Sequence, residues 1–296
     1  MRKPLSFLFG IALVLGMVVV STGCMNEAVA KVSRVLDTLS ASKARHVVMT
    51  AENRLGKVEG ITEAEIVMDS FEDFTLSGDD AVLKAGYNVA GVPSDLQQET
   101  MPDAFIKDGF YYYLYLDPDS LQQRYIKQPV GDTGMKSYKK LFLPPKLVGQ
   151  AVQAGRVKIT VAGRDVDAEV YNVALSQDYL DKLIQRNGPG AAGSLLSLYP
   201  EKARARTEME VPPDVYKFHG YTCRIYLEDG RFVRYEFSFS LTLDNSKFLV
   251  YPGNVSGFTD YQYKETIDVL ETGDYLPIDF PAFTDENTMP PPSFGD

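Results

Sequence analysis

The feature that most constrains the fold of this 296-residue chain is a strict alternation of apolar and polar side chains over residues 233–243, within the stretch RFVRYEFSFSLTL (231–243). Successive side chains of a β-strand point to opposite faces of the sheet, so a period of two predicts a strand with one buried face. The apolar face carries Val233, Tyr235, Phe237, Phe239, Leu241 and Leu243. Asp229 and Gly230 precede the strand, and this pair is typical of a two-residue hairpin turn because glycine accepts positive φ angles.

Similar β-type patterns recur along most of the chain. We expect strands near residues 44–55, 62–70, 71–77, 81–90, 103–107, 110–116 and 122–128, a hairpin over 156–175 that turns at Gly163 and Arg164, and a last strand near 258–270. Apolar residues at three- and four-residue steps predict a helix over 28–39 and a short helix over 176–186 with Ser176 as its cap. A further helical stretch over 136–154 is broken at Pro144 and Pro145, so we expect its helix from about residue 145.

This order of elements predicts an α+β fold, with a large antiparallel sheet and helices on one face. A sheet of about ten strands curls or splits, and we expect a curled half-barrel closed by helices. Residues 44–283 are predicted to form a single domain that contains a long loop over 187–214. The polar, proline-rich residues 284–296 are predicted to be a disordered tail.

The first 24 residues have the layout of a secretory signal. Arg2 and Lys3 precede an apolar run that continues to Val20, and small residues lead to Cys24. The run is shorter than the ~20 residues of a membrane span. Its end resembles a bacterial lipobox, although Ser21 replaces the usual aliphatic residue. We expect residues 1–23 to be removed and Cys24 to carry a lipid ahead of the first helix (24–43); an uncleaved anchor is the alternative.

Charge and cysteine content exclude several classes of function. Loss of Arg2 and Lys3 leaves 28 of the 30 basic residues against 40 acidic ones, a net charge of −12. Such a surface repels phosphate backbones, so we expect no nucleic-acid partner. With Cys24 lipidated, only Cys223 remains and no intrachain disulfide can form, so the fold has to depend on its apolar core.

The stretch IKDGFYYYLYLDPDSLQQRYIKQ (106–128) resembles the central hairpin of the LolA-like superfamily of outer-membrane lipoprotein carriers. The chain is most similar to uncharacterised Gram-positive lipoproteins of that architecture, with SQDYLDKLIQR (176–186) and LEDGRFVRYEF (227–237) as further matching stretches. The resemblance covers residues 26–283. It implies a curled sheet around an apolar cavity, and it carries over no catalytic residue. The chain departs from the pattern in having no tryptophan and an insertion near 187–214.

The strand 110–116 carries aromatic side chains on both faces. Phe110, Tyr112 and Leu114 share one face, and Tyr111, Tyr113 and Tyr115 share the other. Phenol rings can contact an apolar ligand while their hydroxyls reach water or a polar headgroup, so the three tyrosines are the predicted ligand-binding residues. A cross-strand ladder on the outer surface is the alternative.

No motif in the chain predicts catalysis. Two histidines exclude histidine-rich metal sites, and neither G-x-S-x-G nor a phosphate-binding loop occurs. We expect no enzyme activity, no cofactor and no metal. The leading hypothesis is a lipid-anchored protein on the extracytoplasmic side of the cell membrane that binds a lipid or another apolar molecule. The alternative is an envelope interaction or sensor lipoprotein, with a filled core and a protein partner.

Overall fold

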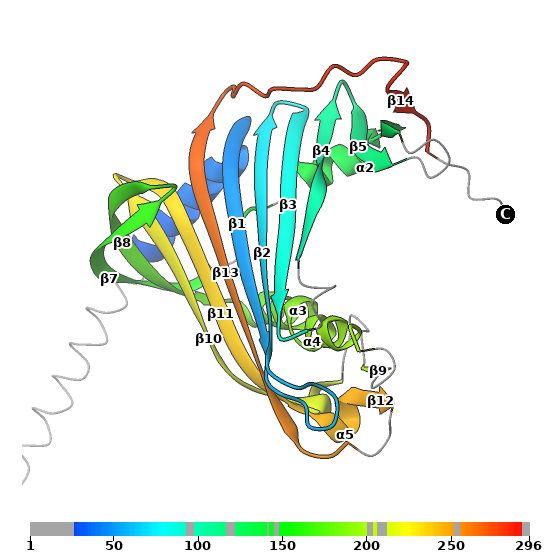
Figure 1. Ribbon diagram of the computed structural model, residues 1–296. Helices are drawn as coiled ribbons and strands as arrows, with labels where there is room; N and C mark the ends of the chain where they lie inside the picture. Colours follow the sequence, from blue (N-terminus) through cyan, green and yellow to red (C-terminus); the bar gives the residue numbers. More distant parts are fainter. Residues whose placement is uncertain are drawn as a thin grey trace, which may run out of the picture.

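The computed structural model describes residues 27–92, 98–116, 122–140, 142–144, 148–199, 204–205, 212–251 and 255–291. These residues form a curled, open sheet of twelve strands in the order β14-β6-β5-β4-β3-β2-β1-β13-β11-β10-β8-β7 (Figure 1). Its strands are β1 (Ala44–Leu55), β2 (Ile66–Ser77), β3 (Asp80–Ala90), β4 (Gln98–Lys107), β5 (Phe110–Leu116), β6 (Gln123–Pro129), β7 (Val148–Val161), β8 (Arg164–Leu175), β10 (Tyr216–Glu228), β11 (Arg231–Asp244), β13 (Phe258–Gly273) and β14 (Thr288–Met289). All pairs are antiparallel except β14 with β6. The predicted large curled sheet is confirmed.

The helices are short beside the sheet. An N-terminal helix covers residues 27–41. The others are α2 (Gly131–Tyr138), α3 (Gln177–Asn187), α4 (Pro189–Leu196), α5 (Asn245–Phe248) and the 3-10 helix η2 (Pro213–Val215). A separate two-stranded sheet pairs β9 (Arg204–Ala205) with β12 (Leu249–Tyr251).

The main core lies between one face of the sheet and the helices, and we call this side the inner face. The N-terminal helix contributes Val32 and Leu36, and α3 contributes Leu180 and Ile184. Residues 235–243 of β11 lie in the same core at their alternate, apolar positions, as the sequence pattern predicts. Val233 differs from the prediction, because it belongs to a separate cluster with Val166 and Tyr226.

The predicted hairpin turn at Asp229–Gly230 is confirmed, and Asp108–Gly109 forms a turn of the same kind. Both residues of each turn have positive φ angles, between 48° and 79°, as a type I′ turn requires. The third hairpin turns one residue earlier than expected, at Ala162 and Gly163, where φ is 49° and 79°.

The helix predicted from about residue 145 is wrong, because residues 148–161 form β7. This strand is the last in the sheet and pairs only with β8. Most of its side chains are exposed on both faces, so its sequence carries no alternation of apolar and polar residues. Likewise, the expected strands 62–70 and 71–77 are one continuous strand, β2.

Two segments predicted to lack regular structure contain it. Residues 187–214 were expected to be a loop, yet α4 starts there at Pro189 and buries Leu195 and Leu196 in the core. Proline fits the first turn of a helix, where its missing N–H is not needed. In the predicted tail, β14 pairs with β6, and the carbonyl of Asn287 accepts a hydrogen bond from the Tyr125 N–H at 2.7 Å. Residues 292–296 lie outside the described part of the chain.

Candidate functional site on the inner face

The inner face is covered unevenly by the helices. Eight side chains that point toward the helices from four adjacent strands are only half-buried, and we call them the inner patch. They are Met49 and Ala51 of β1, Met68, Ser70 and Glu72 of β2, Ala85 and Tyr87 of β3, and Glu265 of β13. Register places them side by side, because Ala51 lies opposite both Ser70 and Glu265, and Glu72 lies opposite both Met49 and Ala85.

The same strands are fully covered at both ends of the inner patch. The flanking residues, each at most 2% exposed, are Val47, Leu55, Ile66, Phe74, Ala81 and Val89. One covered end lies next to α2, where Phe142 packs edge-on against Phe74 with ring centroids 5.3 Å apart. The other lies next to α3 and α4 (Figure 1). The inner patch is therefore a half-buried, partly apolar surface between two packed regions.

Hydrogen bonds join the sheet to the helical segments that cover it at both ends of the inner patch. The guanidinium group of Arg45, fully buried on β1, donates to the carbonyl of Lys139 just after α2. Burial lowers the pKa of Arg45 to about 10. At the opposite end, the Tyr261 hydroxyl donates to the carbonyl of Asn187, the last residue of α3, at 2.7 Å. The helices on either side of the inner patch are thus held in place.

The inner patch also contains polar groups. The Tyr263 hydroxyl donates to Oε2 of Glu265 at 2.7 Å. Burial raises the pKa of Glu265, while this hydrogen bond and the positive charge of Arg186 on α3 act in the opposite direction. Burial also raises the pKa of Glu72, Arg186 lowers it, and the charge of Glu265 raises it further. The two carboxyl groups and the guanidinium group are therefore close enough to affect one another.

The negative charge of Glu265 also acts on two further tyrosines. Burial raises the pKa of Tyr179 on α3 and of Tyr235 on β11, and the negative charge of Glu265 raises both further. The thiol of Cys223 is next to Tyr235, and burial raises its pKa to about 12. Such a thiol is inert at neutral pH, which agrees with its buried position. These groups can donate and accept hydrogen bonds, but they include no activated nucleophile.

The three predicted ligand-binding tyrosines are on the inner face, at its β5 edge. Tyr111 lies opposite Ile106 and stacks against Tyr138 of α2, with ring centroids 6.0 Å apart. Tyr111, Tyr113 and Tyr115 are each half-buried. Tyr112 points to the other face and stacks on Phe283, with centroids 3.9 Å apart. The two sets of side chains thus lie on opposite faces of β5, and the role of the three tyrosines in binding stays a prediction. Cys24 lies outside the described residues.

Sequence reasoning did not identify Glu72 and Glu265. A usable signal exists, because Glu265 is in phase with the buried residues Tyr261, Tyr263, Ile267 and Val269 of β13. A carboxylate at an apolar position of a strand is costly unless it is paired. It therefore marks a position that packing alone does not explain.

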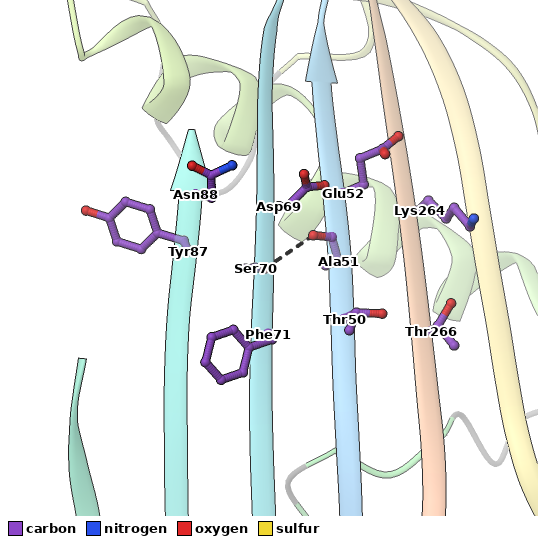
Figure 2. A pocket seen from close by; sticks show the side chains of 10 residues that line it. All are labelled: Thr50, Ala51, Glu52, Asp69, Ser70, Phe71, Tyr87, Asn88, Lys264 and Thr266. Carbon is purple, nitrogen blue, oxygen red and sulfur yellow. Dashed lines mark hydrogen bonds between the residues drawn. The ribbon is translucent and has the colours of Figure 1, made fainter. Parts of the chain in front are cut away.

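A groove of about 520 Å³ lies over the same strands, lined mainly by side chains of the outer face and also by Ala51, Ser70 and Tyr87 of the inner patch. Figure 2 shows the residues that line it, with Thr50 and Glu52 of β1 beside Lys264 and Thr266 of β13. Phe71, which is 43% exposed, is a large apolar side chain in this groove. Glu52 lies directly opposite Asp69 on one side and Lys264 on the other. The groove is therefore mixed in charge and open to solvent.

Comparisons with known proteins leave the family of this chain open. No family model and no curated protein matches it. Among solved structures, the crystal structure of LprF from Mycobacterium bovis is 12% identical and has a TM-score of 0.38, with 87% of this chain and 98% of that chain covered. Lipovitellin is 10% identical, with a TM-score of 0.29 and coverage of 81% and 26%. A Brucella abortus protein of DUF1849 is 11% identical, with a TM-score of 0.23 and coverage of 78% and 100%. These TM-scores are low, so function has to be inferred from the chain's own side chains.

The described residues lack both a membrane-spanning helix and a metal-binding cluster. None of the helices in this part of the chain has the length and apolar character needed to cross a bilayer. The same residues hold no cluster of histidine, cysteine, aspartate and glutamate that could bind a metal ion.

Proposed function

We propose that this chain is a membrane-anchored extracytoplasmic lipoprotein that binds a lipid or another apolar molecule on the inner face of a LolA-like half-barrel. The observation that carries the proposal is the inner patch, whose apolar side chains stay half-exposed between two fully covered ends. Leaving apolar area in water has a free-energy cost that a bound apolar ligand removes.

The composition of the inner patch suits such a ligand. Met49 and Met68 are flexible and polarizable, so they can adapt to ligands of different shape. Ala51, Ser70 and Ala85 are small and leave room above the sheet, and Tyr87 adds an aromatic wall. We place Tyr111, Tyr113 and Tyr115, on the inner face of β5, at the side of the same ligand space.

Ligand binding is tested by placing a larger side chain on the inner face of β1, within the inner patch. Ala51→Phe should lower the affinity of the purified chain for a fluorescent fatty-alcohol analogue at least tenfold, because the new ring occupies the inner patch. Affinity is measured by fluorescence titration, with the melting temperature recorded beside it. Overpacking costs about 1–3 kcal/mol, so the titration is run well below the melting point. Tyr111→Ala, titrated in the same way, shows whether the tyrosine edge takes part.

The matched control is Thr50→Phe, one residue along β1 and on the outer face. It should leave probe affinity within about twofold of the parent chain. A parent chain that binds no apolar probe, by titration and by native mass spectrometry of co-purified lipid, would contradict the proposal. Equal losses from both variants would show that the probe binds elsewhere.

The proposed anchor has its own test. Cys24→Ala should release the protein from the membrane fraction or leave a precursor of higher mass, because a lipobox cysteine is the site of both lipidation and cleavage. Membrane fractionation and intact-mass measurement read out the result. A variant with the mass and fractionation of the parent chain would contradict the lipoprotein assignment without affecting the ligand-binding proposal.

A second candidate is an envelope interaction protein that works through its surface. The observation in its favour is the outer groove with the exposed ring of Phe71. Exposed apolar side chains rimmed by charges are typical of protein contact sites. If Thr50→Phe abolishes capture of an envelope partner while no apolar probe binds, this candidate replaces the first.

A further inference from the structure

The N-terminal helix begins very close to the proposed site of lipid attachment. Only Met25 and Asn26 separate Cys24 from Glu27, the first described residue of the helix. The three backbone steps from Cys24 to Glu27 span at most about 11 Å, even when fully extended. A lipid on Cys24 holds that cysteine at the surface of the bilayer. The part of the fold beside Glu27 is therefore the part that faces the membrane.

A network of charged side chains joins the start of this helix to the β7 edge of the sheet. Lys31, one helical turn after Glu27, forms an ion pair with Glu169 of β8 at 2.5 Å. Its ammonium group also lies 5.6 Å from the centre of the Tyr171 ring. Arg156 of β7 lies opposite Glu169, with 3.6 Å between a guanidinium nitrogen and the carboxylate. Figure 1 shows the same arrangement, with the N-terminal helix beginning beside β7 and β8.

β7 presents an uncovered edge of the sheet at this place. It is the last strand of the sheet, and within the described part of the chain it pairs only with β8. Residues 152–158 are all exposed, and they include the apolar side chains of Val152 and Val157, which are 50% and 43% exposed. An open strand edge with exposed apolar side chains favours aggregation unless something covers it. A membrane surface next to the helix start provides such a cover.

The charge of β7 also suits a membrane surface. The whole chain has a net charge of −10, whereas residues 148–161 contain Arg156 and Lys158 and no acidic residue. Arg156 pairs with Asp167 and Glu169 of β8, but Lys158 forms no ion pair among the residues that the structure describes. Anionic lipid headgroups attract exposed lysine and arginine and repel an acidic surface. Electrostatic attraction therefore favours the same orientation as the short N-terminal connection.

We propose that the β7 edge lies on the membrane surface when Cys24 is lipidated, as the proposed function requires, and that the bilayer is the partner of this edge. Val152 and Val157 lie among the lipid headgroups, and Lys158 lies beside their phosphates. The N–H and C=O groups of an open strand edge have no partners in the hydrocarbon region of a bilayer. The contact therefore stays at the depth of the headgroups, where water and phosphate oxygens can bind these groups.

The test places a fluorescent label on single cysteines of the lipidated full-length protein. Val152→Cys and Val157→Cys report on the β7 edge. Met101→Cys on β4 is the matched control, because Met101 is an apolar strand residue with a similar exposure of 47%. Strands β3, β2, β1, β13, β11, β10 and β8 lie between β4 and β7 in the sheet. Cys223 is buried and takes up no label, and the thiol of Cys24 is blocked by its lipid.

The labelled proteins are bound to vesicles of phosphatidylcholine and phosphatidylglycerol that carry a nitroxide quencher on the headgroup. We expect the quencher to reduce the fluorescence at residues 152 and 157 several-fold more than at residue 101. Cys24→Ala, combined with each label, should abolish this difference. Lys158→Gln should weaken the increase in quenching that additional phosphatidylglycerol causes at residue 157. Lys217→Gln, at an exposed position of β10, is its control and should leave that increase unchanged.

Sedimentation of the vesicles separates this contact from the anchor itself. A protein that sediments with the vesicles but is quenched equally at residues 101 and 157, as when a second copy of the chain covers β7, overturns the contact and leaves the anchor in place. Stronger quenching at Phe258→Cys than at residue 157 also overturns it, because Phe258 is an exposed ring on β13, away from the helix start. A protein that stays in solution overturns both proposals.

Discussion

Replacing Phe237 by aspartate should destabilise the fold more than any other single change considered for the core. Phe237 is 1% exposed and lies at the centre of the main core, where its ring stacks against Tyr235 with centroids 6.4 Å apart and also contacts Phe239. An aspartate at this position removes the ring contacts and buries a carboxylate without a cationic partner. We expect a loss of more than about 4 kcal/mol in the free energy of unfolding, measured by urea denaturation followed by circular dichroism.

Ser238→Asp is the matched control, because it introduces the same side chain one residue along β11. Ser238 points to the outer face, and its hydroxyl is 2.7 Å from that of Thr222. It lies opposite Lys264 on β13, which favours a new carboxylate. We expect a change below about 1 kcal/mol. Similar losses from the two variants would mean that the core does not lie on the face of β11 assigned to it.

The parts of the fold that the sequence predicts well are strands with one buried and one exposed face. β1 and β11 begin and end within one residue or so of their expected positions. In each of them, burial of one face leaves a period of two in the sequence. The Asp-Gly turns are equally readable, because the positive φ angles of Gly109 and Gly230 impose a residue type.

Elements without such a one-sided environment were not predictable. β7 is an edge strand with both faces exposed, so burial imposes no pattern on it. Its neighbours decide its conformation, since the strand exists only through pairing with β8. α4 was not predicted for a different reason, which is its composition. It is rich in glycine and proline, and packing of Leu195 and Leu196 in the core stabilises it where helix propensity does not.

The candidate site depends on contacts that are remote in sequence. Glu72 and Glu265 come from β2 and β13, which the register of the sheet places on either side of β1, and Arg186 comes from α3. The same holds for Tyr112 and Phe283, whose stacking covers the outer face of β5 with a segment close to the C-terminus. A strand's sequence shows which side chains share a face, but it does not show what covers that face.

The bend of the sheet toward its β7 edge depends on Arg234 of β11. Its Nε and one terminal nitrogen donate to the two carboxylate oxygens of Asp268 on β13, at 2.6 and 2.8 Å. That terminal nitrogen also donates to the carbonyl of Thr160 on β7, at 2.8 Å. In sheet order, β8 and β10 separate β7 from β11, so this hydrogen bond joins two strands that do not pair. Arg234 therefore holds the β7–β8 hairpin against the outer face of the neighbouring strands.

Arg234→Met should lower the free energy of unfolding by about 3 kcal/mol, because it leaves Asp268 without its partner in a site where both side chains are only 17% exposed. Removal of both charges, in Arg234→Met with Asp268→Leu, should recover much of this loss, since a buried ion pair can be exchanged for apolar contacts at little net cost. Urea denaturation of the two variants and of Asp268→Leu alone completes a double-mutant cycle.

Arg164→Met provides the control. Arg164 also binds a carboxylate with two hydrogen bonds, but its side chain is much more exposed to solvent than that of Arg234. Arg164 forms a two-pronged pair with Glu228 at 3.0 and 2.8 Å, but its side chain is 60% exposed. Solvent screening limits such a pair to less than about 1 kcal/mol. If Arg164→Met and Arg234→Met destabilise the protein equally, burial is not what gives the Arg234 pair its strength. If Arg234→Met leaves the free energy of unfolding unchanged, the β7–β8 hairpin is held by the apolar contacts of Val161, Val166 and Val233 alone.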